Sequence, residues 1–208
     1  MLRDDLVQQE FLYSDQDVWM QESVEVVLKE VERLDILVRD LLLFARPRQL
    51  RRVQCDLVAL CDQVLNLLQP QFAEANIDLH RVYEVVPIIW VDIGQMEQVL
   101  LNILKNALQA MPEGGIITIA CRSIGTVPPM WVELVVNDTG SGMASDQLAH
   151  IFQPFYTTKA HGIGLGLSIT RRLIEDHGGS LQIESQLGYG TTITIHLPVI
   201  SEDTNNET

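Results

Sequence analysis

Residues 98–115 (QVLLNILKNALQAMPEGG) limit the fold of this chain more than any other segment, because they predict a helix with a broad apolar surface. The apolar residues recur at helical spacing: Val99, Leu100, Leu101, Ile103, Leu104, Ala107, Leu108 and Met111. Asn102 and Asn106 lie four residues apart within this surface, so both carboxamides share one face, one turn apart. A buried amide without a partner costs about 1–3 kcal/mol. We therefore expect these two amides to serve a function.

The segments before this helix indicate mixed α and β structure. Asp56 can cap a helix that runs to about Ala75. Residues 77–83 and 87–91 then have the composition of two strands.

The residues after these strands also predict alternating helices and strands. Asp92 and Gln95 form an Asp-x-x-Gln capping box at the start of the asparagine helix, and Met111–Gly115 end it. The segments that follow are two strands at 116–122 and 130–137, an irregular glycine-punctuated stretch at 138–165, a helix ending at His177–Gly179, and a hairpin of strands 180–185 and 191–197. This order predicts an α+β fold with a helical layer on one face of a mixed sheet.

Residues 18–45 predict a separate, long amphipathic helix. Its apolar residues alternate steps of three and four: Val24, Val27, Val31, Leu34, Val38, Leu41 and Ala45. A lone helix of this kind needs partner helices, from the same chain or from a second one. We interpret residues 1–47 as a helical dimerisation segment, 48–200 as a second domain and the polar residues 201–208 as a disordered tail. A coiled coil without further purpose is the alternative.

Composition excludes several classes of function. The formal net charge of -14 and the pI near 4.6 argue against binding of nucleic acid or of an anionic membrane by bulk electrostatics. Cys55, Cys61 and Cys121 are odd in number and lack metal-ligand spacing, which indicates reduced thiols in a cytosolic protein. No apolar run has the length of a transmembrane helix, so we expect no membrane insertion of this segment.

Two glycine-rich stretches indicate a ligand site. In NDTGSGM (137–143), Asp138 follows a strand, and a carboxylate there can accept a hydrogen bond from an exocyclic amine while the glycines let a flat ring approach. In HGIGLGLSI (161–169), glycines lead into a helix whose first N–H groups can bind phosphate. Taken singly, the first stretch is also a common turn and the second a flexible loop. GYGTTITI (188–195) by itself is an ordinary hairpin turn.

In combination, these motifs resemble the sequence boxes of sensor histidine kinases of two-component systems, of the nitrogen-regulator-like type. The asparagine helix is similar to the N box, DTGSGM to the G1 box, FQPFYTTK to the F box, GIGLGL to the G2 box, GYGTT to the final glycine box, and EVERLDILVRDLLLFARP to the second dimerisation helix. The resemblance covers roughly residues 18–198. It implies the Bergerat ATP-binding fold, a two-layer α/β sandwich shared with type II topoisomerases, mismatch-repair ATPases and a family of chaperones.

The resemblance gives the two asparagines a function. It implies that the chain binds ATP and Mg²⁺ and that Asn106 ligates the metal, with Asn102 one turn earlier in the same cleft. Mg²⁺ favours oxygen ligands such as amide carbonyls, phosphates and water. ATPase relatives carry a water-activating glutamate at the position of Asn102, and an amide cannot act as that base. The sequence therefore departs from the hydrolases in the direction of a kinase.

The remaining site residues also follow from the resemblance. Asp138 is expected to bind the adenine amine, with Thr191 assisting through a water molecule, and Gly140 and Gly142 to let adenine approach the backbone. The phosphates are expected to lie against Gly162, Ile163, Gly164, Leu165, Gly166 and Leu167. Lys159 is expected to contact the γ-phosphate and, with Asn102, to serve catalysis. Residues 143–161 would form a lid over the nucleotide, which Phe152 and Phe155 anchor to the core.

The phosphoacceptor of this family, a histidine followed by an acidic residue, has no match here. The histidines are His80, His150, His161, His177 and His196, and the residues after them are Arg, Ile, Gly, Gly and Leu. Counting back from LLLFARP by the usual hairpin length, we expect the acceptor histidine just upstream of Met1.

The expected function is the ATP-binding catalytic core of a sensor histidine kinase. Its expected partners are a response regulator and a second copy through the 18–45 helix. The expected location is the cytoplasm, in a longer protein that can be membrane-attached. Two alternatives stay open: an anti-sigma-type serine kinase on the same fold, and a non-catalytic module in which ATP only orders the lid.

Overall fold

The computed structural model describes residues 50–125, 131–159 and 163–199, together with positions 20, 23, 24, 26–28, 30, 31 and 38, which are helical. The chain divides into two compact units, Met1–Pro47 and Arg48–Thr208. Most of the predicted 18–45 helix and the whole 201–208 tail lie outside the described residues. Among the described helices, none is long and apolar enough to cross a membrane.

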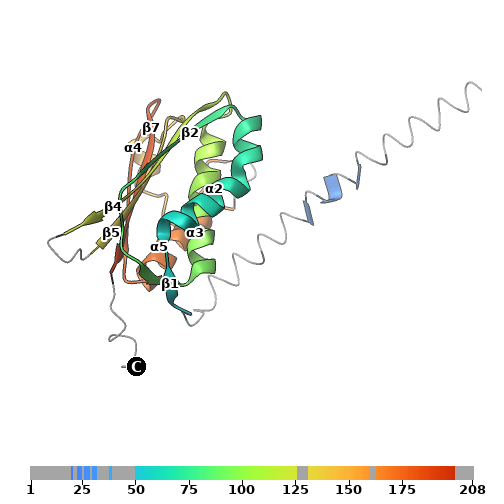
Figure 1. Cartoon of the computed structure of the whole chain (residues 1–208). Helices are drawn as coiled ribbons and strands as arrows, with labels where there is room; N and C mark the ends of the chain where they lie inside the picture. Colours follow the sequence, from blue (N-terminus) through green and yellow to red (C-terminus); the bar gives the residue numbers. More distant parts are fainter. Residues whose placement is uncertain are drawn as a thin grey trace, which may run out of the picture. The chain divides into compact units, whose positions relative to one another are not determined.

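A five-stranded mixed sheet forms one layer of the second unit (Figure 1). The strands, in spatial order, are β2 (Ile77–Tyr83), β4 (Gly115–Ile124), β5 (Trp131–Asp138), β7 (Gly190–Pro198) and β6 (Ser180–Gln186). The β2–β4 pair is parallel, whereas the other three pairs are antiparallel. Two short strands, β1 (Val53–Cys55) and β3 (Ile89–Val91), pair separately. The sequence pattern did not predict β1.

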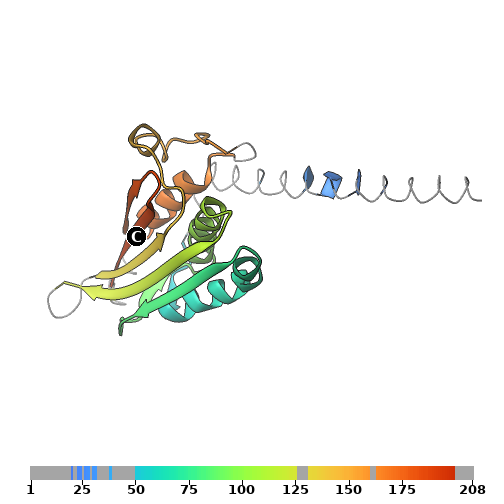
Figure 2. The same cartoon turned by 90° about the horizontal axis from the view of Figure 1, so that it is seen from above.

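Three helices form the second layer, all on one face of the sheet, as the two views in Figures 1 and 2 show. They are α2 (Leu57–Glu74), α3 (Ile93–Ala110) and α5 (Gly166–Asp176). A single helical turn, α4 (Ser145–Leu148), follows β5 in the stretch predicted as a lid. The predicted class, an α+β two-layer sandwich with helices on one face of a mixed sheet, is confirmed.

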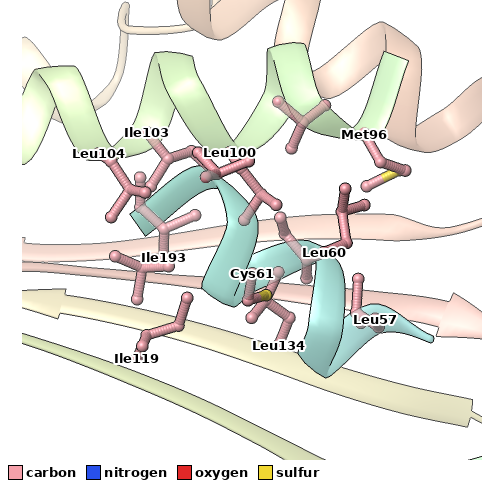
Figure 3. Packing of buried hydrophobic residues seen from close by; sticks show 14 of the residues in the cluster. Leu57, Leu60, Cys61, Met96, Leu100, Ile103, Leu104, Ile119, Leu134 and Ile193 are labelled. Carbon is pink, nitrogen blue, oxygen red and sulfur yellow. The ribbon is translucent and has the colours of Figure 1, made fainter. Parts of the chain in front are cut away.

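The core lies between these two layers (Figure 3). Alternate strand residues, such as Ile119, Leu134 and Ile193, point to the helices, while α3 contributes Leu100 and Leu104 with no exposed surface. The three cysteines are free and buried. The buried side chains of α3 fix the direction of the helix face that carries the two asparagines.

Both predicted N-cap aspartates cap their helices, but the predicted capping box at Asp92 is incomplete. Asp56 caps α2 by accepting from the Ala59 N–H, as predicted. Asp92 Oδ1 likewise accepts from the Gln95 N–H (3.2 Å), but Gln95 does not complete a capping box. The Asp92 N–H donates instead to Nε2 of His177 (2.9 Å), and Gln95 Oε1 is buried with no partner among the described residues. The reciprocal half of the box is therefore wrong, because the C-terminus of α5 packs beside α3 and supplies a better acceptor.

His177 is held in a neutral form at this junction. It lies at the C-terminal cap of α5 and is 1% exposed. Nδ1 lies 2.7 Å from the Leu173 carbonyl oxygen and donates to it, while Nε2 accepts from Asp92. Burial lowers the pKa of this imidazole, so it links α3 to α5 as an uncharged group.

Candidate functional site

Asp138, the last residue of β5, has one carboxylate oxygen held by the backbone. Its Oδ1 accepts from the N–H groups of Gly140 (2.9 Å) and Thr191 (3.2 Å). Among the described residues, no hydrogen bond reaches Oδ2. Burial raises the pKa of this carboxyl group, and the two backbone hydrogen bonds oppose that rise. The arrangement leaves one oxygen of a 7%-exposed side chain to accept from a ligand.

The loop after Asp138 lies between the end of α3 and the β6–β7 turn. Ser141 donates its N–H to the Ala110 carbonyl (3.0 Å), and Gly188 donates to the Ser141 carbonyl (2.8 Å). Gly142 has φ +61°, and a Cβ there would lie 2.0 Å from the Gln186 carbonyl oxygen. Packing of the protein against itself therefore already requires a glycine at 142. The approach of adenine to Gly140 and Gly142 stays a prediction.

Thr191 supports Asp138 through its backbone. Its hydroxyl group lies 2.9 Å from Oγ of Ser185, its partner across the β6–β7 hairpin. Ser185 Oγ also donates to the Gly190 carbonyl and accepts from the Met143 N–H, both at 2.9 Å. Sequence reasoning missed Ser185, which joins the hairpin to the start of the predicted lid. The sequence signal for Ser185 was its position opposite Thr191 in the predicted hairpin.

Asn102 joins α3 to the start of α5. Its Nδ2 lies 3.4 Å from both the Gly166 carbonyl oxygen and Oγ1 of Thr170. Thr170 is fully buried. The amide group thus has partners for its donor side, while no hydrogen bond among the described residues reaches Oδ1. This explains how the helix tolerates one of its two asparagines.

Asn106 belongs to a cation-binding pair of amide oxygens. Its Oδ1 accepts from Nζ of Lys159 (2.8 Å), which also donates to Oε1 of Gln109 (2.5 Å). The Lys159 ammonium group shows that Asn106 Oδ1 is accessible to a positive charge, so the residue fits a Mg²⁺ ligand by its donor chemistry. The described residues include no cluster of three or more His, Cys, Asp or Glu that could hold a metal without further ligands. Sequence reasoning missed Gln109, although it follows Asn106 by three residues and shares its face.

The start of α5 offers free backbone N–H groups. Leu165 occupies the N-cap position, where its side chain cannot accept a hydrogen bond, so no side chain caps the helix. The side chains of Ile163, Leu165 and Leu167 pack in or against the core, which leaves only their backbone available to a ligand. A helix N-terminus with these properties suits an anion such as phosphate. Gly162 lies outside the described residues.

Gly164 fixes the loop before α5 to the predicted lid. It has φ +73°, and a Cβ there would lie 2.5 Å from the Phe155 carbonyl carbon and the Tyr156 oxygen. Phe155 donates its N–H to the Gly164 carbonyl (2.9 Å) and has φ +67°. The Phe155 side chain is 62% exposed, so the prediction that it anchors the lid to the core is wrong. The tight backbone contact turns it outward, and Ile151, 7% exposed, is buried instead.

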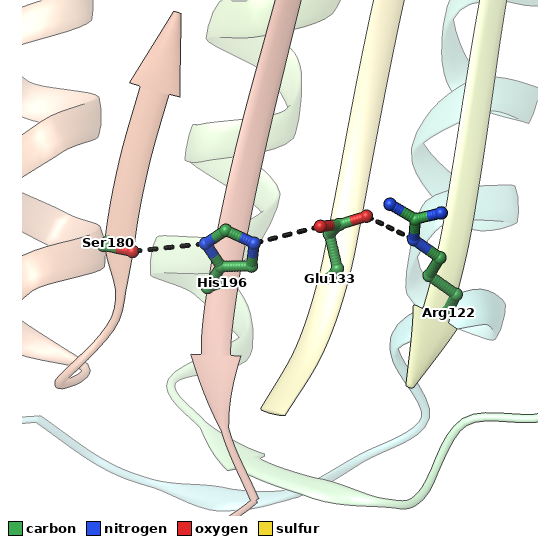
Figure 4. Close-up of polar contacts among 4 residues, drawn as sticks. All are labelled: Arg122, Glu133, Ser180 and His196. Atoms are coloured by element: carbon green, nitrogen blue, oxygen red, sulfur yellow. Dashed lines mark hydrogen bonds and ion pairs between the residues drawn. The ribbon is translucent and has the colours of Figure 1, made fainter. Parts of the chain in front are cut away.

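None of the described histidines forms a hydrogen bond with Asn102, Asn106, Asp138 or Lys159. His80 and His196 are on strands, as predicted, and His150 follows α4. His196 belongs to a polar row across four strands, on the sheet face away from the helices (Figure 4). Its Nε2 lies 3.0 Å from Glu133 Oε2, and Arg122 bonds the other oxygen. These hydrogen bonds lower the pKa of Glu133 against the opposing effect of burial. His161 lies outside the described residues.

Comparison with known proteins agrees with this geometry. Residues 91–201 match the family model described as histidine kinase-, DNA gyrase B-, and HSP90-like ATPase. The sensor histidine kinase ZraS of Escherichia coli is 38% identical over 84% of this chain and 37% of its own length. Sporulation kinase C of Bacillus subtilis is 34% identical over 86% of this chain and 41% of its own length. The chain thus spans about two fifths of the length of these two relatives.

Solved structures show the same relationship. Full-length ShkA in complex with AMPPNP has a TM-score of 0.73 and 31% identity, over 87% of this chain and 39% of that one. The catalytic domain of histidine kinase ThkA has a TM-score of 0.63 and 29% identity, over 72% of this chain and 96% of that one. The similarity to histidine kinases does not favour the anti-sigma-type alternative. The chain belongs to the family of histidine kinase-, DNA gyrase B- and HSP90-like ATPases, and its ATP-binding domain is homologous to those of sensor histidine kinases.

Proposed function

We propose that this chain is the catalytic core of a sensor histidine kinase, which holds Mg²⁺–ATP and transfers the γ-phosphoryl group to a histidine outside its ATP-binding domain. The observation that carries the proposal is a row of side chains on α3, one of which contacts the start of α5 and two of which contact Lys159. Asn102, Asn106 and Gln109 are all amides. None of them can remove a proton from water, so the site can hold ATP without hydrolysing it rapidly.

Each other residue then has a defined task. Asp138 Oδ2 accepts from the adenine amine, and the N–H groups that begin α5 bind the phosphates. Asn106 contributes an oxygen ligand to Mg²⁺, which would neutralise phosphate charge when bound. Lys159 carries a positive charge to the γ-phosphate. The γ-phosphorus–oxygen bond breaks to release ADP, a nitrogen–phosphorus bond forms at the acceptor imidazole, and that ring loses its proton.

The proposal needs an acceptor histidine outside the described ATP-binding domain and a response regulator that receives the phosphoryl group from it. None of the histidines of this chain is followed by an acidic residue. We therefore place the acceptor on the first helix of a dimerisation bundle, to which residues 18–45 would add the second helix. A structure of ThkA in complex with the response regulator TrrA has a TM-score of 0.71 and 27% identity to this chain. By analogy, a response regulator would receive the phosphoryl group, and the reaction would take place in the cytoplasm.

A mixing experiment tests the proposal. The chain is incubated with Mg²⁺ and γ-radiolabelled ATP, alone or with a variant of the sensor histidine kinase ZraS that has been made unable to bind ATP. We expect no label on the chain and an acid-labile label on the ZraS partner. The Asp138→Asn variant of the chain serves as the control, since its weaker ATP binding should leave the partner with much less label at a low ATP concentration. Acid-labile label on the isolated chain would place the acceptor on one of its own histidines and contradict the proposal.

A further inference from the structure

Lys159, in the segment predicted as a lid, contacts two amide side chains of α3. Its ammonium group donates to Asn106 Oδ1 and to Gln109 Oε1 at 2.8 and 2.5 Å. Residues 106 and 109 are one helical turn apart, so their oxygens converge on one cation from the same face. An ammonium group has three N–H donors, and this contact uses two of them.

Mg²⁺ and Lys159 compete for one of these oxygens. If Asn106 Oδ1 ligated Mg²⁺, the metal and the ammonium group would be two positive charges on one oxygen, which repel each other. Lys159 must then release Asn106. Gln109 lies farther along α3 and is exposed, so it can keep its hydrogen bond to the ammonium group while the metal binds.

The structure assigns to Gln109 the role of a positioning residue that holds the Lys159 ammonium group beside the γ-phosphate. This inference rests on the proposed function and deepens it. A neutral amide suits the role because it accepts from Lys159 without adding charge. A carboxylate at this position would repel the triphosphate, and a basic side chain would repel Lys159.

A double-mutant cycle measures this coupling. Affinities for Mg²⁺–ATP and Mg²⁺–ADP are determined by calorimetry for the wild type, Gln109→Leu, Lys159→Met and the double variant. We expect Gln109→Leu to weaken ATP binding about three- to tenfold, the size of one solvent-exposed hydrogen bond, because Gln109 acts on ATP only through Lys159. ADP binding should change by less than about twofold, because ADP lacks the phosphate that Lys159 contacts. In the Lys159→Met background, Gln109→Leu should have no further effect.

Two matched controls and a rescue separate positioning from structure. Gln71→Leu makes the same exchange at an exposed position of α2, and Lys105→Met removes the same charge from an exposed position of α3. Both should leave the ratio of ATP to ADP affinity unchanged. Gln109→Asn keeps the amide acceptor and should restore part of the lost ATP affinity, since the lysine side chain is flexible enough to reach it.

The outcomes distinguish the two proposals. Equal losses of ATP and ADP affinity in Gln109→Leu, or the same loss with and without Lys159, would overturn the positioning role. If the wild type binds ATP and Gln109→Leu binds it with the same affinity, this inference alone is overturned. A wild-type chain that binds neither nucleotide contradicts the proposed function, and the inference falls with it.

Discussion

Replacing Asp138 by asparagine should change which purine the site accepts while leaving the fold intact. Oδ1 accepts from the Gly140 and Thr191 N–H groups, and an asparagine oxygen can keep both hydrogen bonds. Only Oδ2, which no hydrogen bond from a described residue reaches, becomes an NH₂ donor. A donor would then face the adenine amine, which is also a donor. The loss of a hydrogen bond to a charged acceptor amounts to about 1.5–3 kcal/mol, or about 10- to 100-fold in ATP affinity.

The same geometry predicts a gain for a different nucleotide. Inosine triphosphate carries a carbonyl oxygen in place of the adenine amine, and the side-chain amide of the Asp138→Asn variant can donate to it. Calorimetry with both nucleotides should therefore show ATP favoured by the wild type and the preference reduced or reversed in the variant. Thermal unfolding serves as the control, because removing a buried carboxylate with a raised pKa should not lower stability at neutral pH. Unchanged ATP affinity in a folded Asp138→Asn variant would refute the adenine assignment.

Three further predictions concern α3 and its junction with α5. Asn106→Ala should weaken binding of Mg²⁺–ATP far more than binding of metal-free ATP, and calorimetry with and without EDTA that gave equal losses would exclude a ligand role. Asn102→Glu should raise the slow release of inorganic phosphate from ATP, because it restores a base at the position where hydrolases carry one; a phosphate assay that shows no increase would contradict the placement of this side chain. His177 has a lowered pKa, so the unfolded chain binds more protons than the folded one below the ordinary histidine pKa. The free energy of unfolding should therefore fall as the pH drops from about 7 to 5, and denaturant titrations of His177→Gln should lack that part of the slope.

Local rules identified most of the elements because the physics behind them is local. Asp56 and Asp92 cap their helices through their own side chains, and alternation of apolar residues marks strands such as β5. The helix period placed Asn102 and Asn106 on one face. These features depend on residues within a few positions of each other, which the sequence displays directly.

Contacts between distant segments explain where the predictions went wrong. Gln95 was expected to complete a capping box by accepting from the Asp92 N–H. That N–H donates instead to His177, 85 residues away in the sequence. Phe155 was expected to anchor the lid to the core, but its N–H donates to the carbonyl of Gly164 and its side chain is exposed. Neither contact has a signal in the local pattern.

The sequence by itself determined the kinds of polar group at the site, since the amides on α3, the carboxylate at the end of β5 and the glycines around the start of α5 follow from residue type and spacing. Only the tertiary structure decided which atom of each group is available. It assigned Asp138 Oδ1 to the backbone, tied Asn102 to Gly166, and brought Lys159 to Gln109 across 50 residues of chain. The reason is physical: a hydrogen bond commits one atom of a polar group to one partner, and partners far apart in sequence become neighbours only when the layers pack.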